Sequence, residues 1–405
     1  RLDPIRSDIF PDFRFDVKAD IDLFISDLQS LSPKDAKAIS EIFSIMKELH
    51  HVVMTLPADI IWKDPRIEAK YPLFYKYKHK TFKGLLDEYV QDERIRAILC
   101  DRCAFMGLPP SKVSAIGMSA MIITYGMNGG YRVKGLTQRF PDALAGSIKN
   151  NGGNIIYNTT VDKIIIEGNR AAGVVTGDGR VFRAKKIVSN ISAKKTFFEL
   201  AGKENLKDEF IDKIEKMLPS LSFFLVYLGV DMDLKKLGLE HSIGTYPSFD
   251  IEKTFSDINK DICSPNASFE TIIYTLTNPD MAPKDCHSLI LMTKAGYDYK
   301  ESWKGCKDKE AERLIKMAEQ IIPNLSSHII IQDSATPLTL ERYTGNDNGA
   351  AFGWAQGIDH VGANRLQIET PINGLYLTGH WTIPGGGIES VVASGILAER
   401  KIMKG

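Results

Sequence analysis

The sequence has no excess of charge of either sign, because 51 Lys and Arg residues balance 51 Asp and Glu residues over 405 positions. Proteins that bind nucleic acid usually carry a basic face or a large positive charge. We therefore expect no nucleic-acid partner. The sequence also lacks an apolar run long enough to span a bilayer, so we expect no membrane-spanning segment.

Cysteine and histidine are scarce and scattered. The five cysteines form no disulfide-rich pattern, which favours a reducing compartment and predicts a cytoplasmic protein. Cys100 and Cys103 have no second pair that would complete a zinc site. The eight histidines show no ligand spacing, since His50 and His51 merely adjoin. We expect no metal site.

The length predicts two domains, and the order of the patterns predicts an α/β fold. A helix over 138–149 is followed by strand-like runs, which indicates half of a nucleotide-type α/β layer with a small β-meander inserted. Later runs predict a second, mixed sheet, and a polar region over 231–268 shows no clear pattern. The strands expected in the first part are 154–158, 161–167, 171–176 and 181–190, and those of the second sheet are 222–229, 271–277, 289–293 and 329–332.

The N-terminal third has its own pattern. Two short strands flank a turn at 10–13, and helices are expected over 20–31, 34–56 and 84–127. The last of these ends in an apolar stretch that is either plain core or the wall of an apolar pocket. Residues 71–83 alternate aromatic and basic side chains without an acid. This segment is either a solvated loop or a patch that contacts a membrane surface.

The C-terminal stretch has the most informative pattern. A short apolar strand over 375–378 leads into a turn, and three glycines open a helix that continues to the C-terminus. Glycine lets the backbone approach a ligand closely. A helix that begins there directs unpaired N–H groups and its positive dipole end at negative charge. The alternative is an ordinary strand–turn–helix with a flexible connection.

These residues resemble a known family. The segment from Tyr343 to Trp354, then Arg365, then Leu375-Tyr-Leu-Thr-Gly-His-Trp-Thr-Ile-Pro-Gly-Gly-Gly-Ile388 are similar to the C-terminal flavin motif of phytoene-desaturase-like proteins. These are the carotenoid desaturases and isomerases of the FAD-dependent amine-oxidase-like superfamily. Residues 129–190 resemble the middle segment of the same family, and the resemblance covers essentially the whole chain.

The resemblance implies FAD as the cofactor and assigns roles to residues. It places Val161 at the adenine edge, and Asn190 and Ile191 over the adenosine side. It places Gly379 and His380 along the ribityl chain, where many members of the superfamily carry an acid instead of this histidine. Gly386, Gly387 and Ile388 bring the start of the helix to the flavin ring. Tyr343 and Trp354 are candidates to line the substrate end of the flavin, with plain packing as the alternative.

The resemblance also implies a function and a domain arrangement. Hydride transfer from a long isoprenoid or carotenoid to flavin N5 makes the chain a desaturase. The alternatives are a polyene isomerase or reductase on the same scaffold, or a non-catalytic lipid-binding protein. Peripheral contact with a membrane fits such a substrate, and the oligomeric state stays open. We expect an FAD-binding domain of Rossmann type over 129–201 and 341–405, and a substrate-binding domain with a mixed sheet and helices over 1–128 and 202–340.

One part of the family pattern is absent. A strand, a Gly-x-Gly-x-x-Gly turn and a helix usually hold the FAD pyrophosphate. The 405 residues contain no such unit. We therefore expect the FAD-binding domain to be incomplete in this chain and the chain to be a C-terminal portion of a longer polypeptide.

Overall fold

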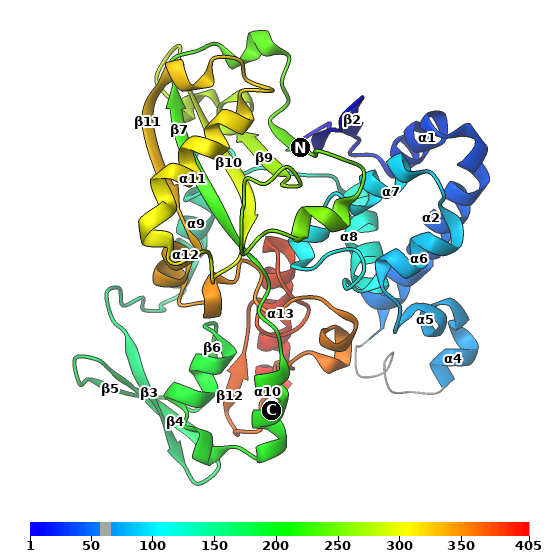
Figure 1. Ribbon diagram of the computed structural model, residues 1–405. Helices are drawn as coiled ribbons and strands as arrows, with labels where there is room; N and C mark the ends of the chain where they lie inside the picture. Colours follow the sequence, from blue (N-terminus) through cyan, green and yellow to red (C-terminus); the bar gives the residue numbers. More distant parts are fainter. Residues whose placement is uncertain (57–65, 405) are drawn as a thin grey trace.

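The computed structural model describes residues 1–56 and 66–404. Its upper part in Figure 1 combines a seven-stranded mixed sheet with a layer of helices. Its lower part holds a three-stranded antiparallel sheet and a pair of parallel strands. The structure is therefore the mixed α/β fold predicted from the sequence, with a second sheet.

The large sheet has the order β11-β7-β10-β9-β8-β1-β2. Its neighbours are antiparallel except for the parallel pair β1 and β8. The strands are β1 (Arg6–Ile9), β2 (Arg14–Val17), β7 (Ser222–Val230), β8 (Ser242–Thr245), β9 (Phe269–Ile273), β10 (His287–Ala295) and β11 (Ile329–Ala335).

The two faces of this sheet are covered to different extents. One face packs against α11 (Trp303–Ala318), where the rings of Phe224 and Trp303 stack 5.5 Å apart. Because successive side chains point to opposite faces, alternate residues of β7, β9 and β10 form the other face. We call its apolar residues the open sheet face, and they are Leu225, Tyr227, Ile272, Ile290 and Met292, all half-buried or exposed.

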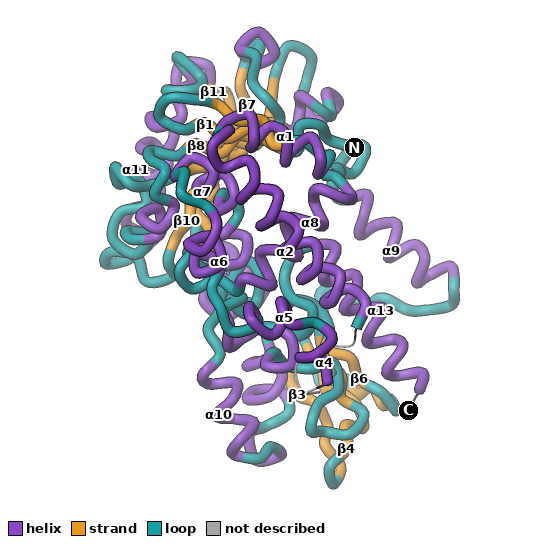
Figure 2. Tube along the Cα trace, turned by 90° about the vertical axis from the view of Figure 1, so that its right-hand side faces the viewer, coloured by secondary structure: helices purple, strands orange, loops and turns teal. Residues whose placement is uncertain are grey.

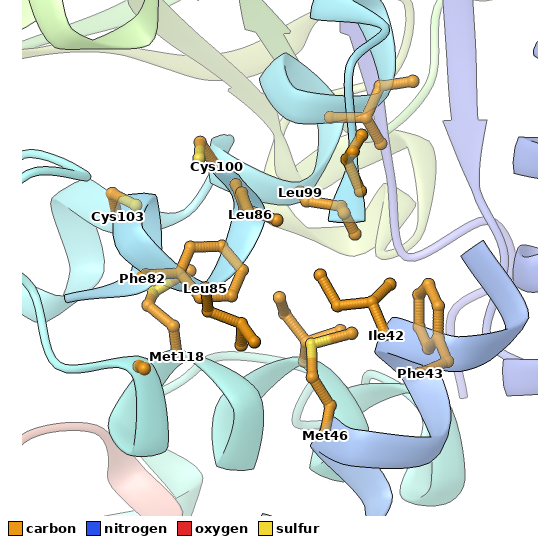
Figure 3. Packing of buried hydrophobic residues seen from close by; sticks show 14 of the residues in the cluster. Ile42, Phe43, Met46, Phe82, Leu85, Leu86, Leu99, Cys100, Cys103 and Met118 are labelled. Carbon is orange, nitrogen blue, oxygen red and sulfur yellow. The ribbon is translucent and has the colours of Figure 1, made fainter. Parts of the chain in front are cut away.

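The helical layer has a core of its own. It consists of α1 (Ile21–Leu31), α2 (Ala36–Thr55), α4 (Arg66–Lys70), α5 (Pro72–Tyr77), α6 (Phe82–Tyr89), α7 (Glu93–Cys100) and α8 (Ala115–Asn128). Figure 3 shows Ile42 and Met46 of α2 packed with Leu85 of α6 and Met118 of α8. The apolar stretch of α8 is thus explained largely by core packing, although Met127 at its end is 60% exposed.

The lower part begins after α9 (Arg139–Asn150). The meander contains β3 (Val161–Glu167), β4 (Arg170–Thr176) and β5 (Val181–Arg183), and the parallel pair consists of β6 (Ile187–Ser189) and β12 (Leu375–Leu377). The helices α10 (Asp208–Lys216), α12 (Pro337–Thr344) and α13 (Ile388–Lys404) complete the chain. The predicted inserted meander is confirmed.

Several sequence-based expectations differ from the structure. The helix expected over 84–127 is divided into α6, α7, the 3₁₀ helix Cys103–Met106 and α8. Residues 154–158 form no strand, and Ile156 and Tyr157 there are 49% and 64% exposed. The run over 181–190 is divided into β5 and β6, which belong to different sheets. Strand β8 lies in the polar region that showed no pattern. Within the described residues, no helix is long and apolar enough to cross a membrane.

Candidate flavin site

The parallel strands β6 and β12 bring two predicted site residues together. Leu377 pairs with Ser189, and the N–H of Thr378 donates to the Ser189 carbonyl at 2.9 Å. Asn190 and Gly379 therefore follow at the same end of the pair. Gly379 has φ +85°, and a Cβ there would collide with the Asn190 side chain. Ligands of α/β folds bind beyond the carboxyl ends of parallel strands, which is where these residues lie.

The glycine turn before α13 forms an open cradle. Gly387 has φ +101°, and a Cβ built on it would meet no atom of the described residues within 4 Å. The next residue, Ile388, begins α13 and is 69% exposed. The first N–H groups of a helix have no intrahelical partner and carry the positive end of the dipole. The turn therefore fits the electron-rich edge of a flavin ring, with space in front of Gly387 and N–H donors beside it.

Arg365 holds the loops behind this cradle. Its side chain is 1% exposed, and its guanidinium donates to backbone carbonyls rather than to an acid. These are the carbonyls of Thr382 at 2.7 Å, His380 at 2.6 Å, Trp354 at 3.3 Å and His360 at 3.2 Å. Burial lowers the pKa of Arg365 to about 9. One side chain thus fixes three segments that surround the site.

His380 is held as a neutral ring. Burial, followed by the nearby charge of Arg365, lowers the pKa of His380 to about 4. Its Nε2 lies 3.2 Å from Oδ1 of Asn346, which also accepts from Trp381 Nε1 at 3.1 Å. Because the Asn346 amide donates to the Ala350 carbonyl at 3.0 Å, its oxygen is the acceptor and His380 Nε2 carries the proton. The Nδ1 of His380 is left as a hydrogen-bond acceptor.

An aromatic wall adjoins the glycine turn. Phe352 lies directly against Gly386, and its ring centroid is 6.1 Å from that of Phe105 and 5.9 Å from that of Phe223. These rings come from the C-terminal loop, from the 3₁₀ helix Cys103–Met106 and from β7. Phe223 precedes Leu225 and Tyr227 on the same face of β7. The open sheet face therefore starts at the aromatic wall.

The remaining predicted residues lie in different surroundings. Val161 begins β3 in the separate meander, and Ile191 is 38% exposed just after Asn190. Trp354 is fully buried against Trp381, and its Nε1 has no hydrogen-bond partner. Tyr343 is 77% exposed on α12. The structure thus brings Asn190, Gly379 and His380 together, whereas Tyr343 points to solvent.

Sequence reasoning missed the residues that support the site. Asn346 and Arg365 stood inside the motif that carried the resemblance, but only their contacts reveal what they hold. Phe105 and Phe223 gave no signal in the sequence, because apolar residues in a helix and a strand usually indicate core. Within the described residues, no group of three or more His, Cys, Asp and Glu side chains is placed to hold a metal ion.

Known proteins match this chain over most of its length. The model of the family "Flavin containing amine oxidoreductase" matches residues 92–403. A prolycopene isomerase of an Oncidium hybrid cultivar is 22% identical over 95% of this chain and 67% of its own length. A zeta-carotene-forming phytoene desaturase of Myxococcus xanthus is 25% identical over 84% of this chain and 65% of its own length. The chain thus spans about two thirds of each of these relatives.

Solved structures share the fold at low identity. An oxidoreductase from Methanosarcina mazei has a TM-score of 0.62 and 18% identity, and covers 98% of this chain with 80% of its own. Cyclohexylamine oxidase from Brevibacterium oxydans has a TM-score of 0.61 and 15% identity, over 98% of this chain and 80% of its own.

Together, the fold, the glycine turn and the matches define an FAD-dependent oxidoreductase of the amine-oxidase type. The chain belongs to the flavin-containing amine oxidoreductase family, and its curated relatives place it near the carotenoid desaturases and isomerases.

Proposed function

We propose that this chain acts on a long apolar isoprenoid and desaturates it with bound FAD. The observation that carries the proposal is the open sheet face, an apolar surface that begins at the aromatic wall beside the glycine turn. A polyene has no polar groups to pair, so a half-buried apolar face that leads to the flavin is a suitable surface for it. The names of the curated relatives, which include prolycopene isomerase and phytoene desaturase, support the same class of substrate.

The residues of the site have separate tasks in this proposal. When bound, the flavin supplies the hydride acceptor, as the cofactor usually carries such chemistry. The N–H groups at the start of α13 stabilise negative charge on the ring edge beside Gly387. Neutral His380 offers Nδ1 to a ribityl hydroxyl, in place of the acid that many relatives carry there. Asn190 and Ile191 cover the adenosine side, and Val161 presents its backbone to the adenine edge.

The predicted division into domains is part of the proposal. Asn190, Gly379 and the glycine turn come from 129–201 and 341–405, and the open sheet face comes from 202–340. Ile214 of α10, which lies within 202–340, nevertheless packs in the core that surrounds β12. The substrate would therefore lie between the two predicted domains, next to the flavin.

Two other reactions are compatible with the same surface. A polyene isomerase and a retinol reductase occur among the relatives, and both would use the open sheet face in the same way. A non-catalytic lipid-binding protein would bind the polyene without converting it. Desaturation and these three alternatives differ in whether a product forms, in the mass of that product and in the redox state of the flavin.

One experiment separates these cases. The full-length, FAD-loaded protein is incubated anaerobically with an acyclic polyene, once with oxidised and once with reduced flavin. A desaturase gives a product lighter by two hydrogens in the oxidised arm only. An isomerase gives a product of unchanged mass, a reductase gives a heavier product in the reduced arm, and an unchanged polyene in both arms contradicts the proposal.

We also propose that residues 71–83 contact a membrane surface from which the substrate is taken. Lys76 and Lys80 pair with Glu88, and Lys83 pairs with Asp87. These lysines are still 41–48% exposed. Phe74 and Tyr77 are fully buried, so the basic groups and not the rings would make the contact.

A further inference from the structure

A buried lysine lies beside the aromatic wall. Lys294 of β10 is 7% exposed, and its Nζ donates to Ser268 Oγ at 2.6 Å. No carboxylate lies within ion-pair distance of it among the described residues. Burial of an ammonium group without a charged partner is unfavourable. A methionine would fill the same space at lower cost, so packing alone does not explain a lysine at this position.

The strand register connects Lys294 with the glycine turn through two aromatic rings. Lys294 is paired directly with Phe223 across the β10–β7 ladder, so both side chains point to the same face. Phe223 contacts Phe352, which lies against Gly386. On the same face of β10, Met292 follows as part of the open sheet face. Glu270 of β9 is paired with Met292 and lies on the same face, so Lys294 and Glu270 are polar groups at the end of this largely apolar surface that adjoins the aromatic wall.

The groups that face Lys294 leave it as the available base. Burial lowers the pKa of Lys294 to about 8, and Glu270 of β9 and Cys103 act against this shift. Glu270 is already paired with Arg6 at 3.0 Å. Burial raises the pKa of the Cys103 thiol well above its ordinary value, so that the thiol stays protonated. On its remaining side Lys294 faces the ring of Phe255 at 4.9 Å.

We propose that Lys294 is the proton acceptor of the desaturation, an inference that rests on the proposed function. One C–H bond of the substrate breaks with its electron pair, and the hydride passes to the flavin. The C–H bond on the adjacent carbon then gives up its proton to the neutral amine of Lys294, and the electron pair of that bond becomes the new C=C bond. The amine becomes an ammonium ion, which donates a hydrogen bond to Ser268 Oγ. FAD is the oxidant.

The test compares the variants Lys294→Met and Ser268→Ala with the wild type, as full-length FAD-loaded protein. The readout is the rate of anaerobic flavin reduction by the polyene as a function of pH. In the wild type this rate rises with pH through about 8. A general base typically contributes about 10²- to 10⁴-fold, so Lys294→Met should lower the rate by about 100-fold or more and flatten the pH profile.

Ser268→Ala tests the role of the hydrogen bond. The hydroxyl accepts from the ammonium form and favours it, so its loss lowers the pKa of the amine and shifts the rising limb to lower pH. A purely structural role would change the rate without this shift. The control is Lys253→Met, because Lys253 is an exposed lysine nearby that pairs with Asp250. This variant should leave both the rate of flavin reduction and the pH at which that rate rises unchanged.

A second readout does not depend on turnover. Competitive acetylation of the full-length protein as a function of pH, read by peptide mass spectrometry, should give an amine at Lys294 that titrates near 8. Two results would overturn the role of Lys294 and leave the proposed function intact. One is a Lys294→Met variant with the wild-type rate and pH profile of flavin reduction, and the other is a Lys294 amine that titrates near its ordinary value. A wild type that converts no polyene while its flavin is reducible overturns the proposed function and this inference with it.

Discussion

At the scale of single residues, Gly387 is the most direct probe of the flavin site. An alanine there would carry its Cβ at φ +101°, which L-residues rarely adopt, and would extend into the space assigned to the ring. We expect Gly387→Ala to lose most of the bound flavin, as measured by visible flavin absorbance per protein in the full-length chain. Gly395→Ala is the matched control.

Gly395 lies in α13, the helix that follows Gly387; it also has open space around it among the described residues and has an ordinary helical backbone. Alanine there should retain flavin and stabilise the helix by about 0.5–1 kcal/mol. Equal flavin content in both variants would contradict the placement of the ring. Gly386 is a poorer choice for this test, because its Cβ would collide with Phe352 and not with the flavin.

Arg365 allows a test of stability. Replacement by Met removes the Arg365 donor from four backbone carbonyls, of which those of Trp354 and Thr382 belong to buried residues, and each buried group left unsatisfied costs about 1–3 kcal/mol. We expect Arg365→Met to lower the free energy of unfolding by about 3 kcal/mol or more, measured by urea unfolding of the full-length protein. Arg342→Met should change it by less than about 0.5 kcal/mol, because Arg342 is an exposed side chain on α12. Similar values for both variants would argue against the role of Arg365.

His380 predicts a pH dependence of stability. Its pKa in the folded protein is about 4, below the ordinary 6.5. Between these values the unfolded chain binds more protons, so the free energy of unfolding falls as the pH drops from 6.5 towards 4. We expect His380→Gln to show a shallower acid decline than the wild type in urea unfolding at several pH values. His51→Gln, at an exposed position on α2, should decline like the wild type, and an equal decline in all three proteins contradicts the buried neutral ring.

At the scale of elements, α5 and α6 carry the proposed membrane contact. Replacing Lys76, Lys78, Lys80 and Lys83 by Gln should release the full-length protein from anionic vesicles, since each basic residue near such a surface is worth about 1 kcal/mol. Because Glu88 neutralises two of these lysines, Glu88→Gln should strengthen the binding. Co-sedimentation that neither change affects would rule out this segment as the contact.

Elements with a strong local pattern could be predicted, and elements defined by their partners could not. The bounds of β3 agree with the prediction, because its run of branched apolar residues ends at the turn signal Gly168-Asn169. Strand β8 has four residues and depends on β1 and β9 for its pairing, so no local pattern indicates it. Residues 154–158 have strand-like composition, but among the described strands none pairs with them.

The candidate site shows the same division. The resemblance predicts roles for Gly379, His380 and Gly387, because these residues belong to one contiguous motif. Lys294 and Phe223 are far apart in the sequence and meet only through the β7–β10 register. A lysine in a strand usually indicates an exposed edge, and burial between a sheet and a helical layer reversed that expectation. Composition and periodicity therefore do not predict which residues of distant strands are paired.

At the scale of the whole molecule, α9 and α13 expose apolar surface. None of the residues of α9 is buried, and Phe140, Leu144 and Ile148 lie on one helical face at 39%, 53% and 48% exposure. Figure 2 shows α9 and α13 on the same side of the molecule, where Ile396 of α13 is 49% exposed. Apolar surface of this kind promotes association.

We therefore expect the protein to associate through this apolar surface and to aggregate. Leu144→Glu combined with Ile148→Glu should reduce the aggregation, measured by light scattering. Leu23→Glu should have little effect, although Leu23 is 56% exposed, because it is a single side chain on α1. A protein that stays monomeric, or an association that the paired Glu substitutions do not change, would contradict this expectation.

The central claim is that the carboxyl ends of β6 and β12 and the start of α13 hold the flavin beside the aromatic wall. The most direct measurement is an experimental structure of the full-length protein with FAD bound. The account predicts a carbonyl edge of the flavin ring within hydrogen-bond distance of a backbone N–H at Gly387 or Ile388, with Phe352 and Lys294 on the substrate side. A flavin bound elsewhere, with Gly387 facing solvent, would contradict the account.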